Sequence, residues 1–595
     1  MDHVPAPPPP PPAPKSSPVV RRAAIGAVAG VLAAGGMAAE LLSRPDSLRN
    51  RVAAAPGVPN RASTPTSRAA VAQRPGLAAG EDDRDSSYVA GDQRPKPPAK
   101  TGPTRDYAGF AAAAKAGRTV PGLLVDKAGP LTAAQAQRHL LNRATFGPRP
   151  SDVESLAKLG IDRWLAAQLS PATKDPAGDE AWRAFKLAGA DPATVRRSVN
   201  QYAWDAMFET GFATLGRQVF GRRQLFEVVV DVFANHLHVS TPSDRGWDVA
   251  PQYATQVIRK HAFGRYADML KAAMRHPAML RYLDNDTSTR ESVNENLGRE
   301  LLELHTVGVS SGYTEKDMRG SAYVLSGRGA TEDGLFEYRP ERHRTGRVKV
   351  LDWSAANTSA RGGLALGDKY LDYLAKHPAT AKTIARKLVV RFVDDVPPRE
   401  LVARLAQVYL RNNTAILPVL TALFRSAEFW NSLGRKTKRP LEDVVGTARA
   451  LDVPFGPSSD KGLEAMYWQL NNLGHAPLAW PSPNGYPDVA PAWSSAGQML
   501  ERWSSHRALS YGWWEGLKRE KLPADLRPRS GDTYREWFDR LGVRLIGQRP
   551  NSRQRSALAQ FVGAKTTSRV DLGRMEWQAG HVVALVLDSP QFLAR

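Results

Sequence analysis

The chain has 595 residues, of which 42% are hydrophobic and 24% charged, and this composition excludes a largely disordered or collagen-like protein. It contains no cysteine, which excludes disulfide scaffolds, thiolate zinc sites, iron–sulfur clusters and cysteine nucleophiles. The net charge of +22 indicates an attraction to anionic partners such as envelope polymers, lipid head groups or nucleic acid.

The first 130 residues lack the apolar side chains that a core requires. They contain 20 of the 45 prolines but only three aromatic residues, Tyr88, Tyr107 and Phe110. So little apolar area does not offset the entropy lost on ordering the chain. We therefore expect a proline-rich disordered tail over residues 1–20 and a disordered linker rich in Pro, Ala and Arg over residues 44–130.

Residues 21–43 lie between these two segments and have the layout of an export signal. Arg21 and Arg22 precede Ala23–Ala39, a stretch without a charged residue. This stretch is short for a membrane span and rich in Ala and Gly. Three interpretations remain open: a cleaved signal, an uncleaved N-terminal membrane anchor, or an Ala-rich segment with no targeting role. The first two predict a secreted or membrane-anchored, extracytoplasmic protein.

From residue 131 onward the pattern predicts one helix after another. Thr132 can cap a helix that runs to about residue 145, and Ser151 with Glu154 has the spacing of a capping box for 152–159. Further helices are predicted over 214–236, 289–307, 378–394, 399–411, 415–429, 439–451 and 572–588. Strand signals occur at Gly334–Tyr338 and Arg347–Leu351. We predict an all-α fold, a large multi-helical globular domain over 131–595 with at most one small β-hairpin, preceded by a disordered N-terminal region.

The predicted helix that follows Asn294 carries a carboxylate in an unusual position. Three charged residues spaced four apart on its outer face predict an ion-pair ladder on the surface. Glu300 instead borders the apolar stripe, and Asn296 lies one turn earlier on the same flank. A carboxylate in this position is either partly buried against a partner or faces a cleft. Glu300 is therefore a candidate catalytic or metal-binding residue, and Asn296 a candidate binding residue.

Two histidines near residue 235 are candidate metal ligands. If the helix stops near Asn235, the extended chain beyond it directs His236 and His238 to the same side. With a carboxylate such as Glu300, they would suit zinc, iron or manganese. If the helix continues, the two side chains diverge by about 200° and no site forms. The structural alternative is that both histidines are hydrogen-bonded residues of the core.

A loop rich in proline and aromatic residues spans 480–488. Trp480 and Tyr486 in this loop, and Trp493 shortly after it, are candidate binding residues because aromatic rings can stack on sugars. The structural alternative is packing over the core. The sequence has no P-loop, no Gly-x-Gly-x-x-Gly after a strand, no His-Glu-x-x-His and no Gly-x-Ser-x-Gly, which argues against a nucleotide enzyme, a zincin protease or an α/β-hydrolase.

Several segments, in this order, resemble the bacterial family called domain of unknown function 1800. The matching segments are His139–Gly147, Asn235–His236, Asn294–Gly308, Gly312–Asp317, His377–Pro398 and Asn484–Asp488. The resemblance covers about residues 131–595 and implies a predominantly helical fold, with export signals in many members, but no known activity or cofactor. The chain departs from the family's pattern at Ala234, where relatives carry a histidine, and at Arg328, where they carry a tryptophan. If that histidine is a ligand in relatives, this chain's site is altered or His238 substitutes for it.

Two functions are compatible with these patterns. The first is an exported or membrane-anchored binding or assembly module of the cell envelope, whose basic surface and aromatic loop contact an anionic cell-envelope polymer or the membrane surface. The alternative is a metal-dependent hydrolase or oxidoreductase that uses His236, His238 and Glu300, in which the ion acidifies a bound water. We do not expect nucleic acid as a partner, because no zinc-finger spacing or RNA-recognition signature accompanies the positive charge.

Overall fold

The structure, a computed structural model, describes residues 124–125, 129–514 and 516–595. The described residues belong to one compact unit. The predicted tail, the predicted signal or anchor and nearly all of the predicted linker lie outside the described residues.

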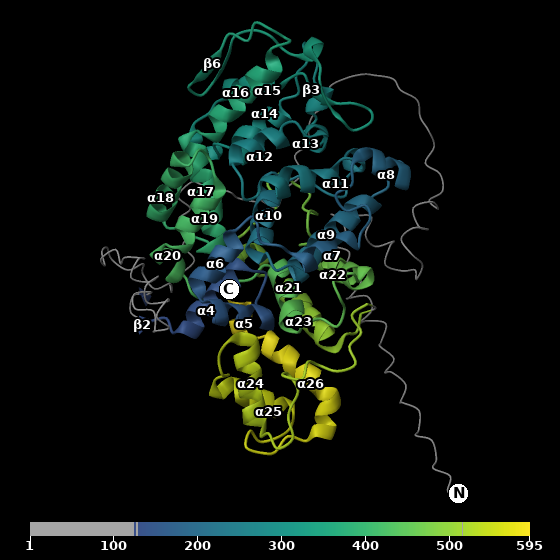
Figure 1. The fold of residues 1–595 in the computed structure, drawn as a ribbon, viewed down its shortest axis with the longest axis vertical. Helices are drawn as coiled ribbons and strands as arrows, with labels where there is room; N and C mark the ends of the chain where they lie inside the picture. Colours follow the sequence, from purple (N-terminus) through teal and green to yellow (C-terminus); the bar gives the residue numbers. More distant parts are fainter. Residues whose placement is uncertain (1–123, 126–128, 515) are drawn as a thin grey trace, which may run out of the picture. The chain divides into compact units, whose positions relative to one another are not determined.

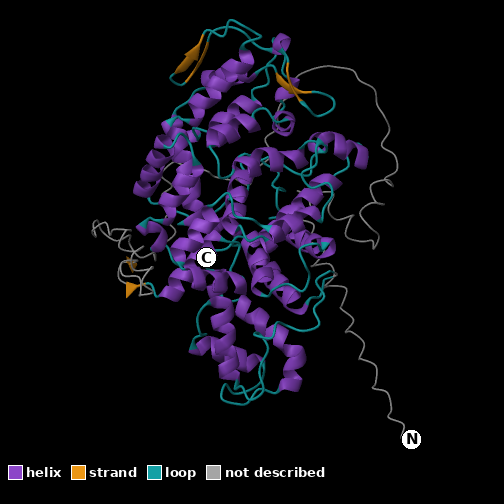
Figure 2. Ribbon diagram, in the orientation of Figure 1, coloured by secondary structure: helices purple, strands orange, loops and turns teal. Residues whose placement is uncertain are grey.

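Helices joined by short loops make up most of the described chain, which confirms the predicted all-α class (Figures 1 and 2). The elements of the first part are β1 (Leu124–Val125), β2 (Gly129–Pro130), α4 (Ala133–Ala144), α5 (Pro150–Leu159), α6 (Ile161–Leu169), α7 (Pro176–Arg183), α8 (Pro192–Ser198), α9 (Asp205–Phe220), α10 (Gln224–His236), η2 (Asp244–Gly246), α11 (Ala250–Tyr253), η3 (Ala254–Arg259), α12 (Tyr266–Ala273), α13 (Pro277–Tyr282), η4 (Asn285–Thr287), α14 (Asn296–Glu300), η5 (Leu301–His305), η6 (Val309–Ser311) and α15 (Glu315–Leu325).

The second part continues in the same way. Its elements are β3 (Arg328–Ala330), β4 (Phe336–Tyr338), η7 (Pro340–Arg342), β5 (Val348–Val350), β6 (Trp353–Ala355), α16 (Gly363–Ala375), α17 (Pro378–Phe392), α18 (Arg399–Arg411), α19 (Ile416–Phe424), α20 (Ala427–Trp430), α21 (Pro440–Ala450), α22 (Asp460–Asn472), η8 (Ala490–Trp493), α23 (Ala496–Tyr511), α24 (Tyr534–Ile546), α25 (Ser552–Phe561), α26 (Leu572–Leu587) and α27 (Pro590–Leu593). No helix in the described ranges is long and apolar enough to cross a membrane.

Two of the predicted helices are interrupted, and local hydrogen bonding explains why. The helix predicted over 214–236 is two helices, α9 and α10, because the carboxylate of Asp175 accepts the backbone N–H groups of Arg222 and Arg223 and removes them from the helical ladder. The helix predicted over 289–307 begins only at α14. The side chains of Ser288 and Thr289 accept backbone N–H groups of the preceding loop and hold it outside the helix.

The strand signals predict the correct segments but the wrong partners. β4 pairs with β3 rather than with the segment near 350, and β5 pairs with β6. Each segment finds an antiparallel partner a few residues away, where the loop that must close is shortest. Including β1 and β2, the described residues contain three two-stranded sheets instead of the single hairpin expected.

Of the two predicted helix caps, one is confirmed and the other is wrong. Thr132 caps α4 as predicted, with its capping box completed by Gln135. At α5 the cap is Arg149 and the box partner Asp152, so the predicted box of Ser151 and Glu154 is wrong. Pro150 explains the earlier start, because proline is favoured in the first turn of a helix, where its missing N–H is not needed.

Besides a small hydrophobic cluster around Val195 and Trp247, one large hydrophobic core runs through the described chain from Leu131 to Phe592. Helix α21 lies within it, and all of its residues from Pro440 to Ala450 are buried. It packs against α9 and α23, and α10 packs against α9 and α17, so these helices surround the middle of the view in Figure 1. A helix buried on every side must satisfy its charged residues within the protein, and Glu442 of α21 does so through Arg439, which also donates to Asp231 of α10.

Candidate functional site

The two predicted metal-binding histidines lie at the end of α10 and bond to different partners. His236 is the last helical residue, and its Nε2 lies 3.0 Å from the hydroxyl of Tyr266. Nε2 of His238 lies 2.6 Å from the carbonyl oxygen of Trp480. Burial lowers the pKa of both imidazoles, so both rings are neutral at pH 7. They behave as the hydrogen-bonded core histidines of the structural alternative.

Glu300 and Asn296 lie on α14, and neither joins these histidines in a ligand set. Glu300 is half-buried, and its pKa is raised by burial and by Glu303. Asn296 is exposed and donates to Asp284 over 3.4 Å. Within the described ranges, no three His, Asp or Glu side chains form a group able to hold a metal ion. The zinc, iron or manganese site predicted from His236, His238 and Glu300 is therefore not assembled in this part of the chain.

The ladder predicted on the outer face of α14 is present. Arg299 lies 3.9 Å from Glu295 and 4.0 Å from Glu303. It also donates over 3.1 Å to Glu315, the first residue of α15. These contacts are surface ion pairs, which solvent screens and which contribute little to stability.

The aromatic loop at 480–488 docks onto the end of α10. The backbone N–H of Tyr486 donates to Oδ1 of Asn235 over 3.0 Å, and the hydroxyl of Tyr486 donates to the carbonyl of Ala476 over 2.8 Å. Tyr486 and Trp493 are buried, and Trp480 is half-buried. Trp493 stacks on His475 with ring centroids 4.6 Å apart. The rings thus pack over the core. Tyr486 also lines the cavity that is described next.

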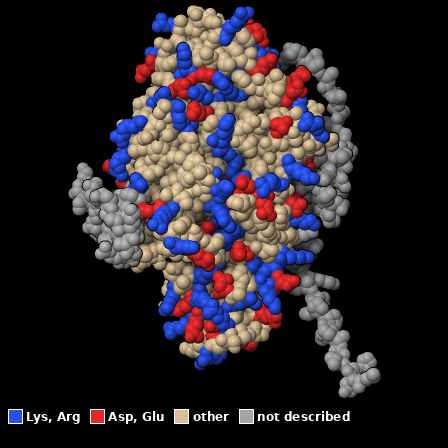
Figure 3. Space-filling model, in the orientation of Figure 1, with Lys and Arg blue, Asp and Glu red and all other residues tan. Residues whose placement is uncertain are grey.

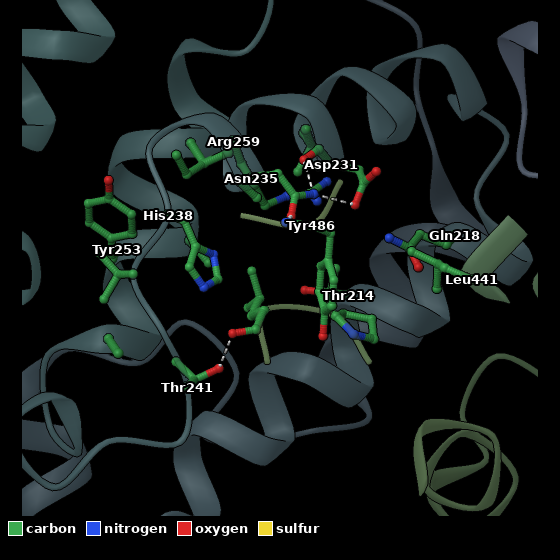
Figure 4. A pocket seen from close by; sticks show the side chains of 18 of the residues that line it. Thr214, Gln218, Asp231, Asn235, His238, Thr241, Tyr253, Arg259, Leu441 and Tyr486 are labelled. Atoms are coloured by element: carbon green, nitrogen blue, oxygen red, sulfur yellow. Dashed lines mark hydrogen bonds between the residues drawn. The ribbon is translucent and has the colours of Figure 1, made fainter. Parts of the chain in front are cut away.

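A cavity opens where the loop meets α9, α10 and η3 (Figure 4). It encloses about 30 Å³, enough for roughly two water molecules. Its polar lining residues are Thr214, Gln218, Asp231, Asn235, His238, Thr241, Tyr253, Arg259, His475 and Tyr486. The half-buried residues Asn235, Arg259 and Leu478 belong to its rim, where solvent reaches the lining. Figure 4 shows His238, Thr241 and Tyr486 around the central space.

Three buried atoms of the lining residues make no hydrogen bond of normal geometry: Oε1 of Gln218, Nδ1 of His238 and Nε2 of His475. The tautomers follow from the bonds that are made. Nε2 of His238 donates to the carbonyl of Trp480, so Nδ1 carries the lone pair, and the ring also lies near the backbone carbonyl of Ala234. Nδ1 of His475 accepts from the Leu441 N–H over 3.3 Å, so its proton is on Nε2. The site therefore offers two acceptors and one donor, and each of these groups costs free energy while it is buried and unpaired.

A buried ion network adjoins the cavity through Asp231. Its carboxylate accepts from Arg439 over 2.8 Å, and Arg439 in turn donates to Glu442 in the first turn of α21. Burial alone would raise the pKa of Glu442, but Arg391 and Arg439 outweigh it and hold that pKa well below its usual range. The charges of this network are therefore paired, and they hold Asp231 in place at the edge of the cavity.

A second set of ion pairs ties the aromatic loop to the same network. Nζ of Lys436 lies 2.6 Å from Asp395 and 3.2 Å from Asp488. The backbone N–H of Ala490 donates to Asp395 over 2.7 Å. The two segments that resemble the family around 392–398 and 484–488 thus meet at one lysine.

Several of these residues were not among the candidates predicted from the sequence, although the sequence contains signals for some of them. Asp231 interrupts a run of valines, and a lone carboxylate in an apolar helix predicts a buried ionic partner. Thr214 and Gln218 lie four apart in the largely apolar α9 and share one face. Nothing in the sequence around His475 indicates that it lines the cavity, because its position depends on the hydrogen bond from Leu441 and on stacking with Trp493.

The comparisons with known proteins identify the family of this chain. No curated protein and no solved structure matches the chain. One family model covers most of the chain, from within α4 to the end of α27. The chain belongs to the family described as protein of unknown function (DUF1800), which matches residues 139–594.

Proposed function

We propose that this protein is an exported or membrane-anchored binding module of the cell envelope, in which the cavity and its solvent-reached rim together hold a neutral acetamido group of an envelope glycan. The observation that carries the proposal is the set of three unpaired buried atoms, on Gln218, His238 and His475, around one cavity. Native proteins rarely leave such atoms unpaired unless a ligand or water completes them.

An acetamido group has the chemistry that this lining would pair. Its N–H donates to Oε1 of Gln218 or Nδ1 of His238, and its carbonyl oxygen accepts from Nε2 of His475. Its methyl group packs against apolar lining residues such as Ile258 and Leu478. A charged group would fit poorly, because both histidines are neutral and the adjoining carboxylate is already paired with Arg439.

The other parts of the proposal rest on the sequence. Residues 21–43 support export or anchoring, and the net charge of +22 supports an anionic envelope polymer or the membrane surface as the wider partner. On the face seen in Figure 3, Lys and Arg are interspersed with Asp and Glu, so the excess charge is spread over that face. The metal-dependent alternative receives no support from the described positions of His236, His238 and Glu300.

The test is saturation-transfer NMR on the purified protein with N-acetylglucosamine, and with glucosamine and glucose as ligands that lack the acetyl group. We expect binding of N-acetylglucosamine alone, with the strongest transfer to the acetyl methyl protons. Equal signals from glucose, or no transfer to the methyl group, would contradict the proposal.

A pair of matched variants assigns the signal to the cavity. Gln218→Leu removes the buried acceptor with little change in volume, so we expect weaker binding without loss of stability, since an unpaired polar group is replaced by an apolar one. Gln560→Leu makes the same change at an exposed position and should bind as the wild type does. Retained binding in Gln218→Leu would place the ligand elsewhere.

A further inference from the structure

A second hollow lies beside the cavity and has a different chemical character. It measures about 520 Å³ and is lined by Thr173, Lys174, Asp175, Pro176, Asp179, Arg183, Arg217, Arg223, Phe226, Glu227 and Arg259. Five of these residues are basic and three are acidic. Arg259 borders both hollows. We call this second hollow the basic cleft.

The carboxylates of the basic cleft are already engaged. Asp175 accepts backbone N–H groups, including that of Arg222 at 2.8 Å. Asp179 pairs with Arg217 over 2.7 Å, and Glu227 holds Arg259 through two hydrogen bonds of 2.8 and 2.6 Å. These bonds satisfy the negative charge of the cleft within the protein.

Three cations of the cleft remain without a direct ion pair to any described carboxylate: Lys174, Arg183 and Arg223. Lys174 and Arg183 are exposed, and Arg223 is half-buried. Two guanidinium Nε donors, those of Arg217 and Arg223, are buried and make no hydrogen bond. The cleft therefore holds an excess of positive charge together with unmet donors.

The guanidinium of Arg223 is held in position before any ligand arrives. It lies over the ring of Phe226 with its central carbon 4.2 Å from the ring centroid. Arg259 packs against the same ring at 5.3 Å and against Trp182 at 5.4 Å. Stacking on an aromatic face leaves the edge of a guanidinium free to donate hydrogen bonds. Burial lowers the pKa of Arg223, and the nearby carboxylates of Glu227 and Asp175, opposed by Arg259 and Arg217, do not fully offset this effect.

From this geometry we propose that the basic cleft binds a phosphate group through Arg223, with Lys174 and Arg183 as further contacts. A phosphate group offers three or more oxygens and can bridge cations that come from separate elements, whereas one carboxylate offers two oxygens. Arginine in a fixed orientation is suited to phosphate recognition. This inference concerns a different hollow from the proposed acetamido site, so either can fail without the other.

The experiment is isothermal titration calorimetry of the full chain with inorganic phosphate in low-salt buffer, with acetate as the carboxylate comparison. We expect saturable binding of phosphate that weakens as salt is added, and at least tenfold weaker binding of acetate. Glycerol phosphate is titrated in parallel. Tighter binding of the ester would identify an esterified phosphate as the natural group, and tighter binding of the free ion would identify free phosphate.

Two neighbouring arginines provide the matched variants. Arg223→Gln should weaken phosphate binding at least tenfold, with an unchanged melting temperature. Arg222→Gln changes the adjacent arginine, which is exposed and does not line the cleft, and should bind phosphate as the wild type does. Absence of saturable binding, unchanged affinity in Arg223→Gln, or an equal loss in Arg222→Gln would overturn the proposal.

Discussion

Asn235 holds the backbone of Tyr486 through a hydrogen bond of 3.0 Å that joins positions 251 residues apart. The amide of Asn235 also donates over 2.8 Å to the carbonyl of Asp231, one turn earlier in α10. One side chain thus fixes the aromatic loop against the helix end that carries His236 and leads to His238. The cavity exists because these two segments are held in contact.

Replacing Gly485 with alanine should destabilise the protein by about 2–4 kcal/mol. The residue has φ 69°, and an added Cβ would collide with the carbonyl oxygen of Asn235. Gly474 is the matched control, because its φ is 71° but an added Cβ would meet no atom within 4 Å. We expect a clearly larger fall in melting temperature for Gly485→Ala than for Gly474→Ala. Equal falls would mean that the close approach to α10 is not maintained.

Glu442→Gln should destabilise the protein by about 3–5 kcal/mol, because it leaves buried guanidinium groups without their counter-ion. Glu442 accepts from the backbone and side chain of Arg439 and pairs with Arg391. Glu428→Gln is the matched control: that carboxylate pairs with the exposed Arg404 over 2.8 Å and should contribute no more than about 1 kcal/mol. Thermal unfolding of the two variants side by side measures the difference, and similar melting temperatures would contradict a buried network.

His506 should stabilise the protein more at pH 5.5 than at pH 8.5. Burial by itself lowers the pKa of His506, but Asp443 and Asp588 outweigh it, and the net shift is upward from 6.5. A pKa raised in the folded state gives stability that is complete below the unfolded value and is lost as the pH rises through the folded value. The difference in melting temperature between the wild type and His506→Gln should therefore shrink as the pH rises. A difference that grows with pH would contradict this assignment.

His276 should make the protein sensitive to acid. Burial lowers the pKa of His276 to about 3. As the pH falls below 6.5, His276 therefore binds a proton in the unfolded chain but stays neutral in the folded protein. Stability is lost progressively between pH 6.5 and about 3. His276→Asn keeps a side chain that can cap α13 but cannot titrate, so its melting temperature should fall less between pH 7 and pH 5.

The half-buried His377 is the matched control for this prediction. It caps α17 in the same way, through Nδ1 and the Ala379 N–H. His377→Asn should change the dependence on pH less than His276→Asn does, because His377 is less buried. Identical pH profiles for the wild type and His276→Asn would show that His276 takes up its proton equally in both states.

Residues close together in the sequence were sufficient to predict much of the fold. Thr132 caps α4 as predicted, and a capping box of Thr314 and Asp317, two residues three apart in the sequence, begins α15. The predicted helix over 399–411 agrees with α18 at both ends. These features depend on hydrogen bonds and apolar contacts between residues three or four apart, which a local pattern records directly.

The candidate site was predicted less well. The histidine and aromatic-loop motifs were both identified, and the burial of Tyr486 agrees with the alternative that the loop packs over the core. The sequence did not predict that His238 bonds to Trp480. The metal hypothesis placed His236 and His238 in one site because of their spacing. In the structure each ring has a different hydrogen-bond partner: His236 bonds to Tyr266 of α12, and His238 bonds to the distant aromatic loop.

The sequence by itself determined the all-α class, the positions of several helices and the family, because these follow from local periodicity and ordered motifs. The tertiary structure alone decided which polar groups share a cavity and which charges are paired. Gln218, His238 and His475 converge only when α21 is buried and the aromatic loop is docked. That convergence depends on contacts between residues hundreds of positions apart, whose free energy comes from the burial of the whole core rather than from any local pattern.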